Sequence, residues 1–294
     1  MGPLELHVVR FRDVPVLQEV LASASLLVEV RDARIPMLSA AWPLPRRFQA
    51  KERVLVLNKT DRAEPNETAR WVEELRRQGQ TVLTASAIAP GQAVAGLRTL
   101  LQERGDARRG RALLRAAIIG LPNVGKSTLL NALVRASRSA TGDRPGITVG
   151  KQWVKLGPAA YLLDSPGAMP LADGIERRLP EQAFKLALCR ILPDGRVEPE
   201  DVAVAFLEWL RRPRASARAS GPYAELLAAQ TPPFETLDLL ARRLSLLAPG
   251  GRPDSSAAAR RIMVDFASGK LGRFTLERVP QAPTRPESQE ARSR

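Results

Sequence analysis

The chain has 294 residues, of which 44% are hydrophobic and 26% are charged, which is enough for one α/β domain and a smaller companion. Its formal net charge of +14 indicates a polyanionic partner, most often nucleic acid, although a genome that favours arginine would give the same excess. One cysteine, Cys189, cannot form an internal disulfide, and one cysteine with one histidine is too few for the usual structural zinc sites. The sequence contains no run of 18 apolar residues that would predict a membrane span, and its N-terminus does not resemble a secretory signal. The cytoplasm is therefore the expected location.

The first half of the chain alternates short apolar runs with stretches of helical periodicity. Strands that alternate with helices are typical of an α/β fold with a largely parallel sheet. We therefore expect an α/β domain over residues 1–172. Strands are predicted at residues 26–30, 54–57, 81–84, 116–119, 151–156 and 160–163, the last two as a pair, and helices at residues 14–24, 68–78, 92–104 and 127–134.

After residue 172 the pattern changes to helices separated by prolines and glycines, with one further strand expected at residues 274–279. This pattern predicts a smaller helical domain over residues 173–279. Residues 280–294 are rich in Pro, Ser, Glu, Gln and Arg, which predicts a disordered tail. Helical periodicity covers residues 181–192, 199–210, 222–229, 235–247 and 255–269.

Residues 120–127, GLPNVGKS, fit the phosphate-binding pattern G-x-x-x-x-G-K-[ST] and lie between a predicted strand and a predicted helix. Two glycines let the backbone wrap around phosphate oxygens, and the start of the helix adds the positive end of its dipole. Lys126 would place its charge on the β- and γ-phosphates, which makes it a catalytic candidate, and the Ser127 hydroxyl would ligate Mg²⁺. A tight strand–helix turn without a ligand is the alternative. The residues expected to bind the nucleotide here are Asn123, Val124, Gly125, Lys126, Ser127 and Thr128.

Residues 58–61, NKTD, follow a predicted strand and fit the N-K-x-D pattern of guanine recognition. The carboxylate of Asp61 can accept two hydrogen bonds from the ring N–H and the exocyclic amine of guanine, a donor pair that adenine lacks. A serine and an alanine after the next strand fit the loop that supports the base through its backbone. Alone, each string could be an ordinary strand-end turn, but beside a phosphate loop the first becomes specific. The residues assigned to guanine are Asn58, Lys59, Asp61, Ser86 and Ala87.

Residues 164–167, DSPG, end the last predicted strand of the α/β domain. Asp164 can hold Mg²⁺ through a water molecule there, and Gly167 can donate its backbone N–H to the γ-phosphate. Thr148 lies between this motif and the phosphate loop, where a threonine ligates Mg²⁺ when the γ-phosphate is present. Thr148 and Gly167 are therefore catalytic candidates, and an ordinary loop threonine and a D-x-P-G turn are the alternatives. Residues 168–174 would tie this switch covalently to the helical domain.

The order of these motifs is the decisive feature. Ordinary GTPases run from the phosphate loop through the switch threonine and D-x-x-G to N-K-x-D and S-A, whereas this chain begins with the last two. Together with DARIP at residues 32–36 and TGDRPGIT at residues 141–148, this order resembles the circularly permuted GTPases, and among them the ribosome biogenesis GTPase A family. The resemblance implies a circularly permuted P-loop GTPase domain of α/β class with a smaller helical C-terminal domain. It also implies a GTPase that assists assembly of the large ribosomal subunit, binds rRNA, and uses GTP with Mg²⁺.

Hydrolysis needs help that the D-x-x-G motif does not supply. In many GTPases a glutamine after that motif orients the attacking water, but Ala168 stands there. The family resemblance favours a potassium ion near Asn123, which joins Ser127, Thr148 and Asp164 as a metal-site candidate. We expect slow hydrolysis by the chain alone and acceleration by ribosomal particles.

The N-terminus departs from the family. Its members usually open with a W-F-P-G-H-M-x-K stretch whose histidine has been proposed to assist hydrolysis, whereas this chain has ELHVVR at residues 5–10. His7, the only histidine, is therefore a catalytic candidate, with a surface histidine as the alternative.

Other functions stay open at this point. A GTP-dependent switch for another RNA or protein partner would use the same motifs without a ribosome role, and a signalling GTPase fits the charge of +14 less well. The permuted GTPases of small-subunit assembly share the motif order but carry an N-terminal oligonucleotide-binding barrel and a Cys/His zinc module, for which this sequence has neither the strands nor the cysteines. No membrane or DNA partner is expected.

Overall fold

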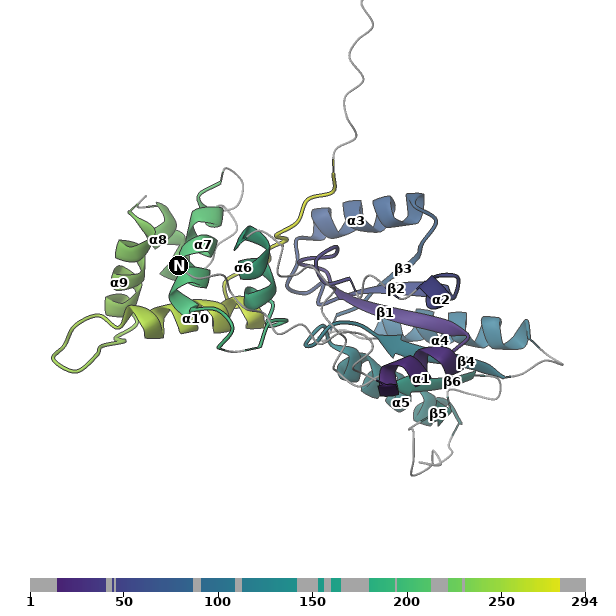
Figure 1. The fold of residues 1–294 in the computed structure, drawn as a ribbon. Helices are drawn as coiled ribbons and strands as arrows, with labels where there is room; N and C mark the ends of the chain where they lie inside the picture. The colour runs from purple at the N-terminus through teal and green to yellow at the C-terminus, as the bar shows by residue number, and fades with distance from the viewer. Residues whose placement is uncertain are drawn as a thin grey trace, which may run out of the picture.

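The computed structural model of the chain shows two regions side by side (Figure 1), a sheet flanked by helices and a group of helices without a sheet. Within the part of the chain that it describes, no helix is long and apolar enough to cross a lipid bilayer. The described residues are 15–40, 44, 46–86, 91–108, 113–141, 153–155, 160–164, 180–193, 195–212, 222–228 and 231–280.

A six-stranded sheet in the order β3-β2-β1-β4-β6-β5 forms the centre of the first region. All neighbouring strands pair in parallel except β5, which pairs antiparallel with β6 at one edge of the sheet. Because β1, β2 and β4 are parallel neighbours, the loops that follow them leave from the same edge, where ligands bind in open α/β sheets. The strands are β1 (Leu26–Asp32), β2 (Glu52–Asn58), β3 (Thr81–Thr84), β4 (Leu114–Ile119), β5 (Trp153–Lys155) and β6 (Ala160–Asp164).

The two faces of the sheet pack against different helices, as the alternation of side chains along β2 shows. Leu55 and Leu57 share one apolar cluster with Trp71 of α3, whereas Val56 belongs to the larger cluster that contains Leu97 of α4 and also includes side chains of α5. The fully buried strand β1 has no polar face to the solvent, as expected for the centre of a parallel sheet. The helices of this region are α1 (Pro15–Ser23), α2 (Arg46–Gln49), α3 (Pro65–Arg77), α4 (Gly91–Asp106) and α5 (Lys126–Thr141).

The second region is helical. Its first four helices each begin at a proline. Proline lacks a backbone N–H, but the N–H groups of a first helical turn have no acceptor within the helix, so proline loses no hydrogen bond there. The fifth begins after Asp254, whose carboxylate accepts a 2.8 Å hydrogen bond from the N–H of Ala257, and it stops at Gly269 in the left-handed conformation at φ 83°. The helices are α6 (Pro180–Leu188), α7 (Pro199–Leu210), α8 (Pro222–Ala228), α9 (Pro233–Arg243) and α10 (Ser255–Ser268).

Four aromatic side chains form a cluster in this second region and its C-terminal end. Phe206 and Trp209 of α7, Phe266 of α10 and Phe274 pack with ring centroids between 5.2 and 6.2 Å apart. Their edge-to-face and stacked contacts stabilise the packing of α7 on α10 beyond the burial of apolar area alone.

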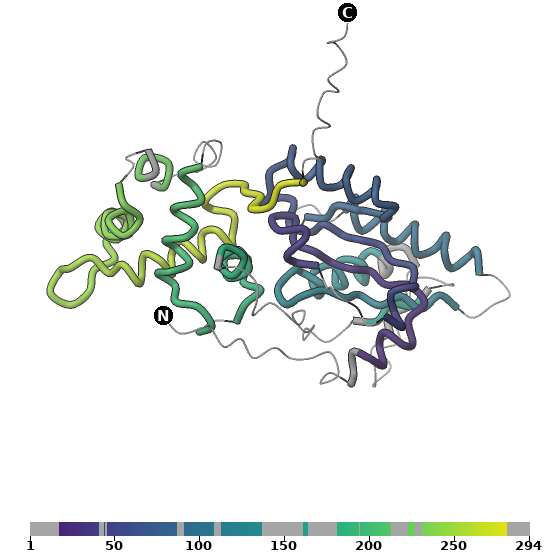
Figure 2. Tube along the Cα trace, turned by 45° about the horizontal axis from the view of Figure 1, so that its top comes forward, coloured from purple at the N-terminus to yellow at the C-terminus, as the bar shows by residue number. Residues whose placement is uncertain are grey.

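Residues 272–280, here called the C-terminal segment, return from α10 to the first region (Figure 2). The N–H of Leu276 donates to the carbonyl of Arg34 at 2.8 Å, and the N–H groups of Met37 and Leu38 donate to the carboxylate of Glu277 at 2.7 and 3.0 Å. The helical region is therefore held to the sheet region by the segment that follows its last helix.

The predicted strands and helices of both regions are confirmed, most with ends that differ by a few residues. The helix predicted at residues 127–134 continues to Thr141, and the short helix α2 was not predicted. The strand predicted at residues 274–279 is wrong. The N–H groups of Phe274 and Leu276 donate to the loop carbonyls of Arg62 and Arg34 instead of to a neighbouring strand. The division at residue 172 stays a prediction, and the tail after residue 280 lies outside the described residues.

Candidate functional site

The loop that follows β4, residues 120–125, makes a tight turn that requires glycine at both ends. Gly120 has φ 152° and Gly125 has φ 102°, values that other residues rarely adopt. A Cβ on Gly120 would lie 2.5 Å from the carbonyl oxygen of Val30, and a Cβ on Gly125 would lie 2.1 Å from Nδ2 of Asn58. Any side chain at either position would therefore push the loop away from β1 or from the loop after β2.

Lys126 lies inside this turn. Its side chain is 6% exposed, and its Nζ donates to the carbonyls of Gly120 at 2.9 Å and Leu121 at 2.8 Å. These bonds hold a positive charge next to the start of α5, where the first backbone N–H groups of the helix have no acceptor within it. Ser127 and Thr128 on the first turn are exposed. The combination of a buried ammonium, the backbone N–H groups of a helix N-terminus and an exposed hydroxyl suits a phosphate group.

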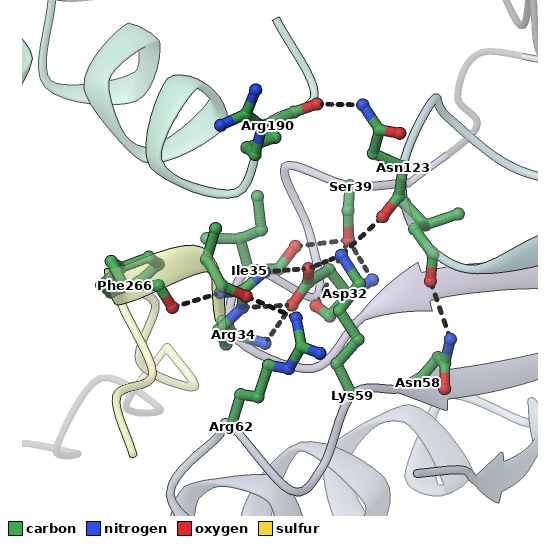
Figure 3. A network of polar contacts seen from close by, with 12 residues as sticks. Asp32, Arg34, Ile35, Ser39, Asn58, Lys59, Arg62, Asn123, Arg190 and Phe266 are labelled. Atoms are coloured by element: carbon green, nitrogen blue, oxygen red, sulfur yellow. Dashed lines mark hydrogen bonds and ion pairs between the residues drawn. The ribbon is translucent and has the colours of Figure 1, made fainter. Parts of the chain in front are cut away.

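The loop after β2 contacts the phosphate-binding loop directly, although the two are 66 residues apart in sequence. The side-chain amide of Asn58 donates to the carbonyl of Val124 at 2.8 Å, and Nζ of Lys59 donates to the carbonyl of Asn123 (Figure 3). The N-K-x-D motif and the phosphate loop thus lie side by side.

Asp61 and Ser86 come together at the ends of β2 and β3. The hydroxyl of Ser86 donates to Oδ1 of Asp61 at 2.9 Å, and Nε of Arg62 donates to Oδ2 at 3.3 Å. The backbone N–H of Thr60 donates to the carbonyl of Ala85 at 3.1 Å, which ties the two loops together. The Asp61 carboxylate is 7% exposed, so its charge lies in a partly desolvated position where hydrogen bonds to a ligand are stronger than in water.

A buried ion-pair group lies beneath the contact between the two loops. Asp32, at the end of β1, accepts two side-chain hydrogen bonds from Arg34, from Nε at 2.9 Å and from Nη2 at 2.7 Å, and its Oδ2 lies 3.0 Å from Nζ of Lys59. Burial alone would raise the pKa of Asp32, but the charges of Arg34 and Lys59 outweigh it and hold that pKa well below its usual range. Asp32 is therefore an anion throughout the physiological pH range.

The phosphate loop also contacts the helical region. Nδ2 of Asn123 donates a 2.6 Å hydrogen bond to the carbonyl of Arg190, just beyond α6. Asn123 and Arg190 both have φ 58°, so each lies at a turn that presents it to the other region. The neighbouring Cys189 is buried, and burial raises the pKa of its thiol to about 12, so the thiol stays neutral at pH 7.

Comparison with known proteins identifies this constellation. A family model described as "50S ribosome-binding GTPase" matches residues 115–215. The chain is 32% identical to ribosome biogenesis GTPase A of Priestia megaterium over 90% of this chain and 92% of that protein, and 33% identical to the protein of that name from Thermotoga maritima over 89% of both. The chain belongs to the ribosome biogenesis GTPase A family. It is therefore a P-loop GTPase of α/β class.

Solved structures of relatives in this family have the same fold. The GNP-bound YlqF from T. maritima has a TM-score of 0.65 and 32% identity, over 89% of this chain and 96% of that one. The GDP-bound form of that protein has the same TM-score, with 30% identity and coverage of 89% and 98%. The ribosome biogenesis GTPase A fold thus accounts for both regions of the chain.

The structure brings together most of the residues that the motifs single out. Asn58, Lys59, Asp61 and Ser86 lie at the ends of β2 and β3, beside the loop and first helical turn that hold the residues from Asn123 to Thr128. Asp164 ends β6 opposite Ile118 of β4, and so lies at the edge from which the phosphate loop leaves. His7, Ala87, Thr148 and Gly167, as well as Ala168, are outside the described residues.

Sequence reasoning assigned no chemical role to Asp32 and Arg34, which stood only as part of the DARIP string. A signal was available, because an aspartate that ends a strand parallel to the N-K-x-D strand must lie beside it. The register pairs Asp32 with Asn58, which places Lys59 one residue beyond the pair.

Proposed function

We propose that this GTPase binds GTP between the loops after β2 and β4, hydrolyses it, and couples hydrolysis to assembly of the large ribosomal subunit through binding of rRNA in the cytoplasm. The observation that carries the nucleotide site is the contact of the N-K-x-D motif with the phosphate loop, through Asn58 to Val124 at 2.8 Å. The ribosomal role is supported by membership of a family whose relatives are named for ribosome biogenesis.

On the guanine side, Asp61 would accept the two N–H groups of the base, while Ser86 and Arg62 hold the carboxylate in place. On the phosphate side, Lys126 would exchange one of its loop carbonyls for phosphate oxygens, and the N–H groups at the start of α5 would complete the cradle. Ala87 would support the base, and Gly167 would donate to the γ-phosphate.

The donor set at the start of α5 fits Mg²⁺, which neutralises charge on the phosphate oxygens. The Ser127 hydroxyl is exposed on the first turn, and Asp164 ends the neighbouring strand β6. We propose that Ser127, Asp164 and Thr148 hold Mg²⁺, that Asn123 offers an oxygen to K⁺, and that His7 assists hydrolysis.

Charge supports an RNA partner. The net charge is +14, and exposed arginines lie on the helical region at its surface turns and helix ends. Lys185 adds little to this positive surface, because its side chain is 12% exposed and pairs with Glu181 at 3.5 Å. Exposed arginines at such places include Arg211, Arg242, Arg252 and Arg273.

The test is sedimentation of the full chain with purified large ribosomal subunits and their precursors, in the presence of a non-hydrolysable GTP analogue. Co-sedimentation with large-subunit particles but not with small subunits is expected. Binding to another RNA with no preference for these particles would support the alternative, a GTP-dependent switch without a ribosome role.

Filter binding to large-subunit rRNA across a salt series provides the second arm of the test. A steep loss of affinity with salt is expected, because phosphate contacts release counterions. An affinity that salt does not change would argue against binding through the arginines.

A further inference from the structure

Three charged side chains and one backbone carbonyl form a chain of contacts from the helical region to the phosphate loop (Figure 3). Arg34 donates to the carboxylate of Asp32 through Nε at 2.9 Å and Nη2 at 2.7 Å. The same carboxylate lies 3.0 Å from Nζ of Lys59, which in turn donates to the carbonyl of Asn123. Asp32 thus stands between the two cations and fixes the distance from each.

The other side of the Arg34 side chain contacts the helical region. Its Nη1 donates to the carbonyl of Phe266 at 3.1 Å, and its guanidinium carbon lies 5.0 Å from the centroid of the Phe266 ring. Its own carbonyl accepts the N–H of Leu276 at 2.8 Å. Because these contacts surround the side chain, which is 1% exposed, the guanidinium has little freedom to move.

Burial of so many charges is costly, and a hydrophobic cluster would stabilise this junction at least as well. Stability alone therefore does not explain this buried ion pair, whereas a role in fixing one arrangement of the two loops does. Here the fixed group is the ammonium of Lys59, the second residue of N-K-x-D. Lys59 has φ 62°, a strained backbone conformation for a lysine, so its placement is imposed by its surroundings.

We propose that Asp32 and Arg34 are positioning residues for the guanine nucleotide. Arg34 orients Asp32, Asp32 holds the ammonium of Lys59 against the phosphate loop, and the two nucleotide-binding loops thereby keep the spacing that a bound nucleotide requires. The inference rests on the proposed nucleotide site. It adds two residues outside the N-K-x-D and phosphate-loop motifs, and it makes nucleotide affinity depend on a residue that anchors the helical region.

The experiment measures GDP affinity of the full chain by calorimetry in a double-mutant cycle of Arg34→Lys and Lys59→Met. Lysine keeps the charge at position 34 but cannot make two parallel bonds to a carboxylate, so Arg34→Lys is expected to weaken GDP binding about tenfold. In the Lys59→Met background the same change is expected to have little further effect on GDP affinity, because the ammonium through which Arg34 and Asp32 act is absent. If the loss of GDP affinity in the double variant equals the product of the two single losses, Arg34 acts independently of Lys59 and the proposal is wrong.

Thr275→Val is the matched control. Oγ1 of Thr275 accepts the N–H of Glu64 at 3.1 Å, so this buried residue joins the same two regions through a residue that lies three positions beyond the N-K-x-D motif. It is expected to lower the urea midpoint of unfolding and to leave GDP affinity unchanged. A loss of affinity equal to that of Arg34→Lys would mean that any loosening of the junction weakens binding, and would also overturn the proposal.

A milder variant covers the case in which Arg34→Lys does not fold. Oγ of Ser39 accepts the backbone N–H of Asp32 at 2.9 Å, so Ser39→Ala disturbs Asp32 without changing a charge. It is expected to weaken GDP binding about threefold in the parent and not in the Lys59→Met background. If the parent chain does not bind GDP, both the proposed function and this inference are wrong. If the parent binds GDP and neither Arg34→Lys nor Ser39→Ala weakens binding, only this inference is wrong.

Discussion

The side-chain amide of Asn123 donates a 2.6 Å hydrogen bond to the backbone carbonyl of Arg190, and this contact joins the phosphate loop to the end of α6. The helical region therefore meets the sheet region at two places near the proposed nucleotide site, since Arg34 also donates to the carbonyl of Phe266. In the proposed site, a change at the phosphates would have a direct path to the helices through Asn123. The path does not depend on residues 168–174, which were expected from the sequence to carry the coupling.

The first prediction concerns Gly125. Gly125→Ala is expected to abolish measurable GDP binding, because the new Cβ would lie 2.1 Å from Nδ2 of Asn58 at a backbone φ of 102°. Gly79→Ala is the matched control, since Gly79 also has a positive φ of 81° but no atom lies within 4 Å of an added Cβ. The control should cost about 1–2 kcal/mol of unfolding free energy and keep its affinity for GDP. Calorimetry and urea unfolding measure the two quantities, and an equal loss of affinity in both variants would contradict the close-contact argument.

The second prediction concerns base selection by Asp61. Asp61→Asn is expected to weaken GTP binding at least tenfold, because each lost hydrogen bond to a charged acceptor is worth about 1.5–3 kcal/mol. The amide of asparagine can donate to a carbonyl where guanine carries its amine, so the variant should gain affinity for xanthosine triphosphate. Ser86→Ala keeps the charged acceptor and removes only one hydrogen bond that positions it, so it should have a smaller effect. Equal affinity of Asp61→Asn and parent for GTP would reject the assignment of Asp61 to the base.

The third prediction concerns hydrolysis without a partner. Ala168 stands where many GTPases carry the glutamine that orients water, so the isolated chain is expected to turn over more slowly than about 10⁻³ s⁻¹ in sodium buffer. Phosphate release should rise with potassium in place of sodium, and again with large-subunit particles. Asn123→Ala should remove the potassium effect. Rapid turnover of the isolated chain in sodium alone would show that the chain completes the site by itself.

The sequence predicted the sheet, the helices and the position of each nucleotide loop because these depend on local patterns. The phosphate loop is a continuous string, and the apolar run before N-K-x-D identifies β2. Contacts between distant segments could not be predicted in this way. Arg34 and Phe266 are 232 residues apart, and Asn123 and Arg190 are 67 residues apart, so neither pair leaves a periodic or motif signal. Residues 274–279 were taken for a strand because apolar residues at alternate positions, such as Phe274 and Leu276, are typical of both a strand and an extended segment that packs on loops.

The last prediction concerns coupling between the nucleotide and the ribosomal particle. A ligand shifts an equilibrium only through a difference in its contacts with the two states, and a γ-phosphate with its cations would compete with Arg190 for Asn123. We therefore expect affinity for large-subunit particles to differ at least about fivefold between a non-hydrolysable GTP analogue and GDP, which is the lower end of typical coupling. By reciprocity, the particles must change the ratio of the two nucleotide affinities by the same factor.

Asn123→Ala tests whether the contact carries this coupling. The variant loses the bond to Arg190 and is expected to bind particles with similar affinity in both nucleotide states. Thr275→Val, which breaks a contact between the regions at Glu64, beyond the N-K-x-D motif, should keep the difference. Sedimentation with quantified bound protein measures the affinities of the parent and the two variants in both nucleotide states. If the parent chain binds both nucleotides but binds particles equally well with either, the nucleotide does not control the helical region. If the difference exists and survives in Asn123→Ala, the coupling runs through Arg34 or through the chain that follows Asp164, and the contact with Arg190 only joins the two regions.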